Sequence, residues 1–200
     1  MYILAGRFKG RRLSVPANRI LRPTTGLLRK ALFDLLAPGL AGADFLDLYA
    51  GVGSVGLEAL SRGAGRVTLV EGDGRVGESL RENIRILLEA SGRDGGEPIT
   101  PDRVVFWPRP VEKSLARLGE TGSRYRFIFA DPPYRTDPKE LAGLLLSIKK
   151  ARLLEEGGRL VLQHDQHLLK DPRFQKTLAA EANPPAIRRY GSSALTIFYA

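Results

Sequence analysis

The sequence contains no cysteine, one methionine and one tryptophan in 200 residues. Without cysteine the chain forms no disulfide and offers no thiolate to a metal ion. No apolar run approaches the length that crosses a bilayer, and the N-terminus lacks the apolar core of a signal peptide. We therefore expect a cytoplasmic protein with no membrane partner. The composition, 43% hydrophobic and 26% charged, is that of an ordinary globular protein.

Acidic residues are absent from the first 33 positions, which carry eight bases. The rest of the chain is close to neutral, so nearly all of the net charge of +9 lies in its first sixth. Such asymmetry favours a polyanionic partner, above all nucleic acid. A basic segment that is merely solvated is the alternative. The eight bases are Arg7, Lys9, Arg11, Arg12, Arg19, Arg22, Arg29 and Lys30.

The N-terminal region predicts a hairpin followed by a helix. Apolar residues spread over 2–15 around Lys9-Gly10 predict a β-hairpin with a basic tip. Apolar residues then recur at three- and four-residue steps over 28–36, with Thr24 or Thr25 as N-cap and Pro38-Gly39 as the stop. Arg29, on the opposite face of this helix, extends the basic surface. We take residues 1–22 as an RNA-contacting extension and residues 23–200 as the main domain.

Strands and helices alternate along the rest of the chain, which predicts an α/β fold with a doubly wound, mostly parallel sheet. The segment between residues 91 and 102, rich in glycine, proline and charge, is expected to be an exposed loop. The expected strands are 45–50, 66–70, 104–107, 127–130, 160–162 and 195–199, and the expected helices are 57–62, 76–90, 111–118 and 141–148.

A glycine-rich turn follows the first of these strands. The segment Gly51-Val52-Gly53-Ser54-Val55-Gly56 opens a helix, and Glu71 ends the next strand, 20 residues beyond Gly51. Glycines let a turn approach a ligand closely, and an acid at this spacing binds ribose hydroxyls. Together these features indicate a nucleoside-containing cofactor. A nicotinamide-dependent oxidoreductase uses the same pattern, but no evident acid/base pair for hydride transfer accompanies it here.

A second motif, Asp131-Pro132-Pro133-Tyr134, follows the apolar run that ends at Ala130. The prolines lack a backbone N–H and end the strand, leaving a carboxylate, rigid carbonyls and an aromatic ring at its end. This set suits a planar base: Tyr134 stacks on it while Asp131 and the Pro132 carbonyl accept hydrogen bonds from an exocyclic amine. A plain Asp-Pro turn is the alternative. Strands one and four can be neighbours at a switch point, where both motifs would serve group transfer to nitrogen.

These two motifs resemble those of the class I S-adenosylmethionine-dependent amino-methyltransferases. Within that class the chain is similar to the RsmD family, which methylates the exocyclic amine of a guanine in bacterial 16S ribosomal RNA. Residues 22–25, 56–63 and 190–195 match that family's signatures. The resemblance implies a Rossmann-like fold with a seven-stranded sheet. It also implies S-adenosylmethionine as cofactor, S-adenosylhomocysteine as product, and a monomer that acts on 16S rRNA, free or in a small-subunit assembly particle.

The resemblance also implies roles for individual residues, with Asp47 near the ammonium group of the cofactor and no metal. The chain departs from the family at Pro110, where an Asp or Asn commonly faces the adenine, and at Gln163, where a Glu often ends the fifth strand. The catalytic residues implied are Asp131, Pro132, Pro133 and Tyr134; the cofactor contacts are Asp47, Tyr49, Gly51, Gly53, Gly56, Glu71 and Asp131; the RNA contacts are Arg7, Lys9, Arg11, Arg12, Arg22, Thr24, Thr25 and Arg29.

Two further alternatives stay open. A DNA adenine or cytosine methyltransferase shares the Asp-Pro-Pro-Tyr motif, but it usually carries a separate target-recognition region, for which this chain has little room. An RNA-binding protein without catalysis is disfavoured by the intact motif. His164 and His167 lack nearby acids in a matching pattern and make a poor metal site.

Overall fold

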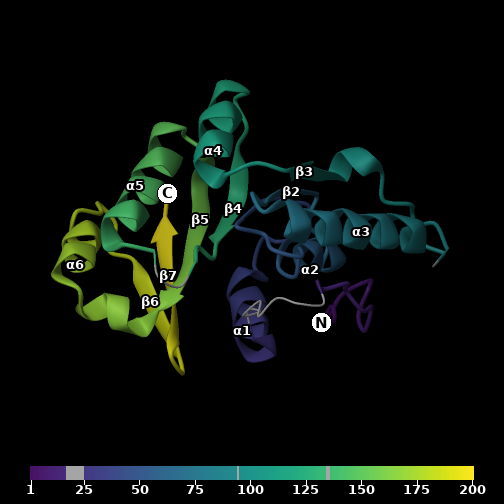
Figure 1. Cartoon of the computed structure of the whole chain (residues 1–200), viewed down its shortest axis with the longest axis horizontal. Helices are drawn as coiled ribbons and strands as arrows, with labels where there is room; N and C mark the ends of the chain where they lie inside the picture. Colours follow the sequence, from purple (N-terminus) through teal and green to yellow (C-terminus); the bar gives the residue numbers. More distant parts are fainter. Residues whose placement is uncertain (17–24, 94, 134–135) are drawn as a thin grey trace. The chain divides into compact units, whose positions relative to one another are not determined.

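The computed structural model describes residues 1–16, 25–93, 95–133 and 136–200, in two compact units, Met1–Pro110 and Val111–Ala200 (Figure 1). Three predicted site residues, Arg22, Thr24 and Tyr134, lie outside the described residues. The domain boundary predicted after residue 22 lies there too and stays a prediction. None of the helices in the described ranges is long and apolar enough to cross a membrane.

The first unit contains three parallel strands in the order β3-β2-β1. Asp44 of β1 pairs with Arg66 of β2, and Val67 of β2 pairs with Val104 of β3. Helix α2 packs against β1 and β2. The elements are α1 (Gly26–Leu36), β1 (Asp44–Leu48), α2 (Gly56–Ser61), β2 (Arg66–Val70), α3 (Gly74–Ser91), a 3₁₀ turn at Pro101–Arg103 and β3 (Val104–Trp107).

Helix α1 forms where its apolar spacing and cap predict it. The Thr25 side chain accepts a hydrogen bond from the Leu28 N–H, which satisfies one of the free donors of the first turn. Leu28, Leu32 and Leu36 are buried on one face, and the helix ends just before Pro38. Thr25 is thus the N-cap, as predicted.

The second unit has strand order β4-β5-β7-β6, with β4 and β5 parallel and the other pairs antiparallel. Helix α5 packs against α4 and α6, as Figure 1 shows. The alternation of helices with parallel strands confirms the α/β class. The elements are α4 (Val111–Glu120), β4 (Tyr125–Ala130), α5 (Pro138–Lys150), β5 (Leu154–Asp165), a 3₁₀ turn at Gln166–Lys170, α6 (Pro172–Ala179), β6 (Ala186–Tyr190) and β7 (Ser193–Tyr199).

Two strands of this unit differ from the prediction. β5 spans 12 residues, whereas only three were expected. The prediction was too short because the first half of the strand carries Glu155, Glu156 and two glycines, which are typical of a loop. Pairing with β4 shifts register between Tyr125 and Phe127, which accommodates that segment. β6 was not expected as a strand, since Arg188 and Arg189 are exposed and interrupt its apolar pattern.

The N-terminal segment pairs its two arms as the predicted β-hairpin would, but only over a short length. Tyr2 forms an antiparallel bridge with Arg12, and the N–H groups of Ile3 and Leu13 donate to the carbonyls of Arg11 and Met1 across the two arms. The described residues of the segment contain no longer strand. The segment is also bound to α2: the Arg7 and Phe8 N–H groups donate to the carbonyl and hydroxyl of Ser61. Contacts to α2 add to the pairing between the two arms, so the segment is part of the first unit.

Candidate functional site

The glycine-rich turn leaves β1 with several residues in the left-handed region. Tyr49, Gly51 and Gly53 have φ values of 60°, 58° and 84°. A Cβ at Gly53 would lie 2.6 Å from Leu80 of α3, so that position requires glycine for packing as well. At Gly51 nothing lies within 4 Å of such a Cβ. The turn is therefore held closely against α3, while the space beside the Gly51 Cα is open.

Glu71, at the end of β2, bonds the turn directly. Its Oε2 accepts a hydrogen bond from the Gly51 N–H at 2.9 Å, and its Oε1 accepts one from the Asp73 N–H at 2.7 Å. The side chain is half-buried. Since a carboxylate offers about four acceptor positions, two remain for hydroxyl groups of a ligand. The spacing of 20 residues seen in the sequence thus corresponds to a real contact.

Asp47 is 1% exposed and lies on β1 beneath the turn. Its Oδ2 accepts a hydrogen bond from the Gly56 N–H at 2.8 Å, at the start of α2. The carboxylate stabilises the helix start, where free N–H groups and the helix dipole favour negative charge. In the structure Asp47 therefore holds the turn, and the contact with a cofactor ammonium group stays a prediction.

Two buried side chains hold the carbonyls of the turn. Asn83 of α3 donates from Nδ2 to the Val52 carbonyl at 2.9 Å, and Arg29 of α1 donates to the Ser54 carbonyl at 3.2 Å. Both also bind the N-terminal segment: Asn83 pairs with the N–H and carbonyl of Ser14, and Arg29 donates to the Tyr2 carbonyl. Asn83 was missed from the sequence, although a lone amide among the apolar positions of 76–90 was a usable signal.

The structure corrects the prediction made for Arg29. It was expected on the RNA-binding surface, but it is only 4% exposed. Burial lowers the pKa of its guanidinium from the ordinary value, and the Glu58 carboxylate, 3.8 Å away, opposes that shift. Its hydrogen bonds within the first unit occupy it, so Arg29 is not available to phosphates.

The other basic residues predicted to bind RNA remain at the surface. Lys9, Arg11 and Arg12 are exposed on the N-terminal segment. Arg7 is also exposed, but its guanidinium donates to the Ser91 and Glu97 carbonyls at 2.8 and 2.6 Å. Arg7 therefore holds part of the fold together through its guanidinium. The exposed basic side chains of this segment for which the structure shows no such role are those of Lys9, Arg11 and Arg12.

The Asp-Pro-Pro motif follows β4 in the second unit. Asp131 is half-buried, Pro132 is buried and Pro133 is exposed. The backbone N–H and hydroxyl of Thr136 both donate to the Pro133 carbonyl, at 2.9 and 2.6 Å, so that carbonyl is already paired. No residue in the described ranges donates to the Pro132 carbonyl. A rigid acceptor thus stands next to a carboxylate.

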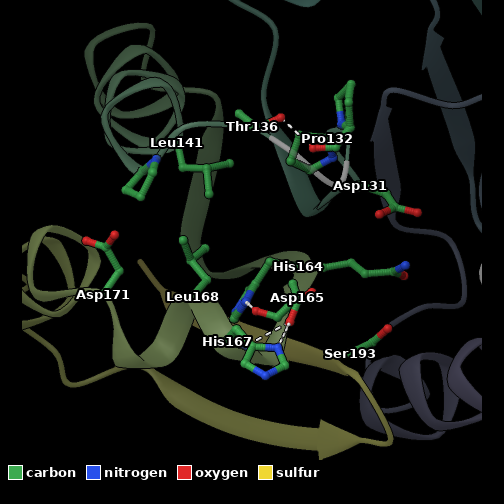
Figure 2. A pocket seen from close by; sticks show the side chains of 13 residues that line it. Asp131, Pro132, Thr136, Leu141, His164, Asp165, His167, Leu168, Asp171 and Ser193 are labelled. Carbon is green, nitrogen blue, oxygen red and sulfur yellow. Dashed lines mark hydrogen bonds and ion pairs between the residues drawn. The ribbon is translucent and has the colours of Figure 1, made fainter.

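A pocket of about 310 Å³ opens beside this motif, entirely within the second unit (Figure 2). Thr136 and Pro132 lie across it from His167 in the view. Its size suits one planar base and part of a sugar rather than a larger ligand. Its walls include Asp131, Pro132, Gln163, His164, His167 and Ser193.

His164 forms an uncharged wall of this pocket. Its ring nitrogens lie 2.8 Å from the Thr196 hydroxyl and 2.7 Å from the Asp165 carbonyl, and the ring meets Phe174 edge-on. Burial lowers the pKa of His164 below its ordinary value of 6.5, so the imidazole is neutral at pH 7. No cluster of three or more metal-ligating residues occurs in the part of the chain that the structure describes.

Comparison with solved structures defines the class of protein. The Thermus thermophilus hypothetical protein TTHA0928 matches with a TM-score of 0.76 and 36% identity, covering 100% of this chain and 99% of that one. A precorrin-6y C5,15-methyltransferase from Geobacter metallireducens, 14% identical, shares the fold with a TM-score of 0.66 over 94% and 93%. SMU.776 complexed with SAH, 13% identical, matches with a TM-score of 0.64 over 86% and 48%. The fold is that of the Rossmann-like methyltransferases.

The family follows from the sequence matches. The model of the family described as Conserved hypothetical protein 95 matches residues 1–198. Ribosomal RNA small subunit methyltransferase D of Escherichia coli K12 is 37% identical over 158 residues, which are 79% of this chain and 68% of that protein. The chain belongs to this family, the RsmD family, as its motifs indicated.

Proposed function

We propose that this protein transfers a methyl group from S-adenosylmethionine to the N2 amine of a guanine in small-subunit ribosomal RNA. The Asp131-Pro132 corner, open on a pocket that fits a base, carries the proposal. Family membership and the name of the Escherichia coli relative support ribosomal RNA as the substrate. The protein would act as a monomer in the cytoplasm, on free 16S rRNA or on an assembling particle.

The first unit fits the cofactor. Gly51 leaves its backbone open, and Glu71 keeps two acceptor positions for ribose hydroxyls. Tyr49, Gly53, Gly56 and Asp47 shape and brace the same turn. When bound, S-adenosylmethionine supplies a methyl group on a sulfonium, which passes to the amine nitrogen and leaves S-adenosylhomocysteine.

The second unit fits the amine. The guanine lone pair is delocalised into the ring, which makes the nitrogen a weak nucleophile. Asp131 and the Pro132 carbonyl would accept its two N–H hydrogens, which favours a tetrahedral nitrogen and the positive charge that develops on it. Asp131 would then take the proton that the amine loses. Tyr134, outside the described residues, would stack on the base once it leaves the RNA stack.

The RNA would be held first by phosphate contacts from Lys9, Arg11 and Arg12, which are exposed on the N-terminal segment. Arg7 would contribute where its guanidinium edge remains exposed. Arg22, Thr24 and Thr25 stand in the chain beside this segment and would extend the same surface.

A direct assay tests the function. Small-subunit RNA and particles from a strain that lacks this gene are incubated with the protein and labelled S-adenosylmethionine, and the product is mapped by mass spectrometry. We expect one additional methyl group, on a guanine N2, in small-subunit RNA from the deletion strain. Transfer to double-stranded DNA instead, or no transfer to either RNA form, would overturn the proposal.

A further inference from the structure

Gln163, which lines the pocket beside Asp131, has a buried amide oxygen with no hydrogen-bond partner among the described residues. Gln163 Oε1 is shielded from solvent and has no hydrogen-bond partner in the described part of the chain. Gln163 also lines the pocket together with Asp131 and Pro132. A buried acceptor without a donor lowers stability by about 1–3 kcal/mol, so such atoms are few in native proteins. An acceptor kept at that cost in a pocket wall points to a donor on the ligand.

The register of the sheet places Gln163 next to Asp131. Strands β4 and β5 are parallel, and their last matched pair is Ala130 with Leu162. Asp131 and Gln163 are the next residues on each strand, and neighbouring strands lie about 4.8 Å apart. Both residues face the same pocket. A carboxylate just beyond the end of β4 therefore stands beside an amide on the adjacent strand β5.

The donors and acceptors on the edge of a base decide whether it can pair with Asp131 and Gln163. Guanine presents the N2 amine, then the N1–H donor, then the O6 acceptor. Asp131 and the Pro132 carbonyl only accept, which suits the amine. The Gln163 amide offers an acceptor and a donor, which suits N1–H and O6 in that order. A base with an acceptor at N1 would face Oε1 lone pair to lone pair, leaving both groups unpaired.

We propose that Gln163 selects guanine by accepting the N1–H on Oε1 and donating from Nε2 to O6. The inference rests on the proposed function and names the residue that recognises its acceptor base. A carboxylate at position 163 would keep the contact to N1–H but not the one to O6. Selection then comes from the oxygen, and the amide nitrogen adds to it.

The test uses 2-aminopurine, which keeps the 2-amine but lacks the N1–H and O6. RNA is synthesised with guanine or 2-aminopurine at the methylated position and presented in whichever form, free or assembled, supports methylation of guanine. The ratio of kcat/KM for guanine to that for 2-aminopurine is measured for the wild type and for Gln163→Met, a change that nearly conserves volume. Dividing one ratio by the other cancels the intrinsic reactivity of the two amines.

We expect the ratio to fall by about tenfold or more in Gln163→Met, because the variant has no acceptor to be left unpaired. For Gln163→Glu, the logarithm of the ratio of kcat/KM values should stay at least half as large as in the wild type. Gln175→Met is the matched control: Gln175 is exposed on α6 and is not among the residues that line the pocket, and its replacement should leave the ratio unchanged. Binding of S-adenosylhomocysteine and the melting temperature verify that each variant folds.

The outcomes separate this inference from the proposed function. Failure of the wild type to methylate the guanine RNA would contradict the function itself. Normal guanine methylation with equal ratios in the wild type and Gln163→Met would overturn only the role of Gln163. If neither Gln163 variant folds, the wild type alone decides: methylation of 2-aminopurine within about threefold of guanine would exclude selection by N1–H.

Discussion

Single residues in this protein serve the fold and the site at once, and Glu71 is the clearest case. Its two oxygens bind the N–H groups of Gly51 and Asp73, so the carboxylate joins the turn after β1 to the end of β2. The acceptor positions that remain are held in place by these same bonds. Orientation of a ligand hydroxyl there needs little further ordering, which favours binding.

Replacing Glu71 by Ala should raise the Kd for S-adenosylmethionine by about tenfold or more, since the proposed ribose contacts and the support of Gly51 are removed together. Isothermal titration calorimetry measures this. Glu78→Ala removes an exposed carboxylate on α3 and should leave the Kd unchanged. A Kd for Glu71→Ala within about twofold of the wild type would remove Glu71 from the cofactor site.

His164 makes stability depend on pH in a definite direction. Its pKa in the folded protein is lowered by burial below 6.5, so the unfolded chain binds the proton more readily. As pH falls from about 7.5 through 6.5 toward the folded-state pKa, the free energy of unfolding should decrease. Urea unfolding at pH 7.5 and 5.5 should show a smaller decrease for His164→Asn than for the wild type. An equal decrease in both would contradict this assignment.

At the scale of elements, the N-terminal segment and the glycine-rich turn share two side chains. Asn83 joins Ser14 to Val52, and Arg29 joins Tyr2 to Ser54. Residues that were expected to form an appendage are therefore bonded, through one intervening side chain, to the turn expected to hold the cofactor. Loss of either bridge should loosen both elements.

Asn83→Ala should lower the free energy of unfolding by about 2–3 kcal/mol, because the change leaves the buried Val52 carbonyl and the Ser14 N–H without their partner. It should also weaken cofactor binding, since the turn loses a brace. Chemical denaturation and calorimetry give the two values. Glu82 is a half-exposed neighbour on α3 that pairs with Arg85, and Glu82→Ala should change stability by less than about 0.5 kcal/mol. A similar effect of both changes would refute the bridging role.

Sequence patterns predicted the elements whose signals are local. The Thr25 cap and the apolar spacing of α1 come from neighbouring residues, and the acid 20 positions after Gly51 comes from a fixed βαβ geometry. The first half of β5 was missed because Glu155, Glu156 and two glycines are typical of a loop, although Leu154 pairs with Tyr125 of β4. The strand β6 was missed because pairing with β7 overrides the propensity of its charged residues.

In the site, too, the features with local sequence signals were predicted and the others were not. The Asp131 motif and the turn at Gly51 are short motifs with fixed backbone chemistry, so the sequence indicates them. Asn83 acts through contacts with residues 31 and 69 positions away, and the burial of Arg29 depends on Glu58 and α2. Such contacts exist only in the folded chain, and no local pattern carries them.

For the molecule as a whole, the excess positive charge lies in the N-terminal part of the chain, where several basic side chains are exposed. The acid-free first 33 residues include Lys9, Arg11 and Arg12, all exposed, while Arg29 is withdrawn into the first unit. A small number of accessible bases thus accounts for the expected attraction to RNA phosphates, and affinity should depend on salt accordingly.

Changing Lys9, Arg11 and Arg12 together to Gln should weaken RNA binding and reduce the slope of log K against log salt by roughly 0.7–0.9 for each phosphate that is no longer neutralised. Filter binding across a salt series measures this. Changing Lys139, Lys150 and Lys176 to Gln removes the same net charge from exposed positions of the second unit. The slope should then stay near that of the wild type. Equal slopes for the two triple variants would show that Lys9, Arg11 and Arg12 do not contact the RNA phosphates.

The cofactor is assigned to the first unit, and the target amine is assigned to the Asp131-Pro132 corner of the second. The two tasks should therefore be separable by mutation. Asn in place of Asp131 keeps the size of the side chain but removes its charge and its capacity to take the proton from the amine.

The most direct measurement is the single-turnover rate of methyl transfer to small-subunit RNA by Asp131→Asn, with the Kd of S-adenosylhomocysteine measured on the same preparation. We expect a rate at least about 100-fold lower than that of the wild type, with a Kd within about threefold. A rate near that of the wild type with the cofactor bound would contradict the assignment of Asp131 to the amine.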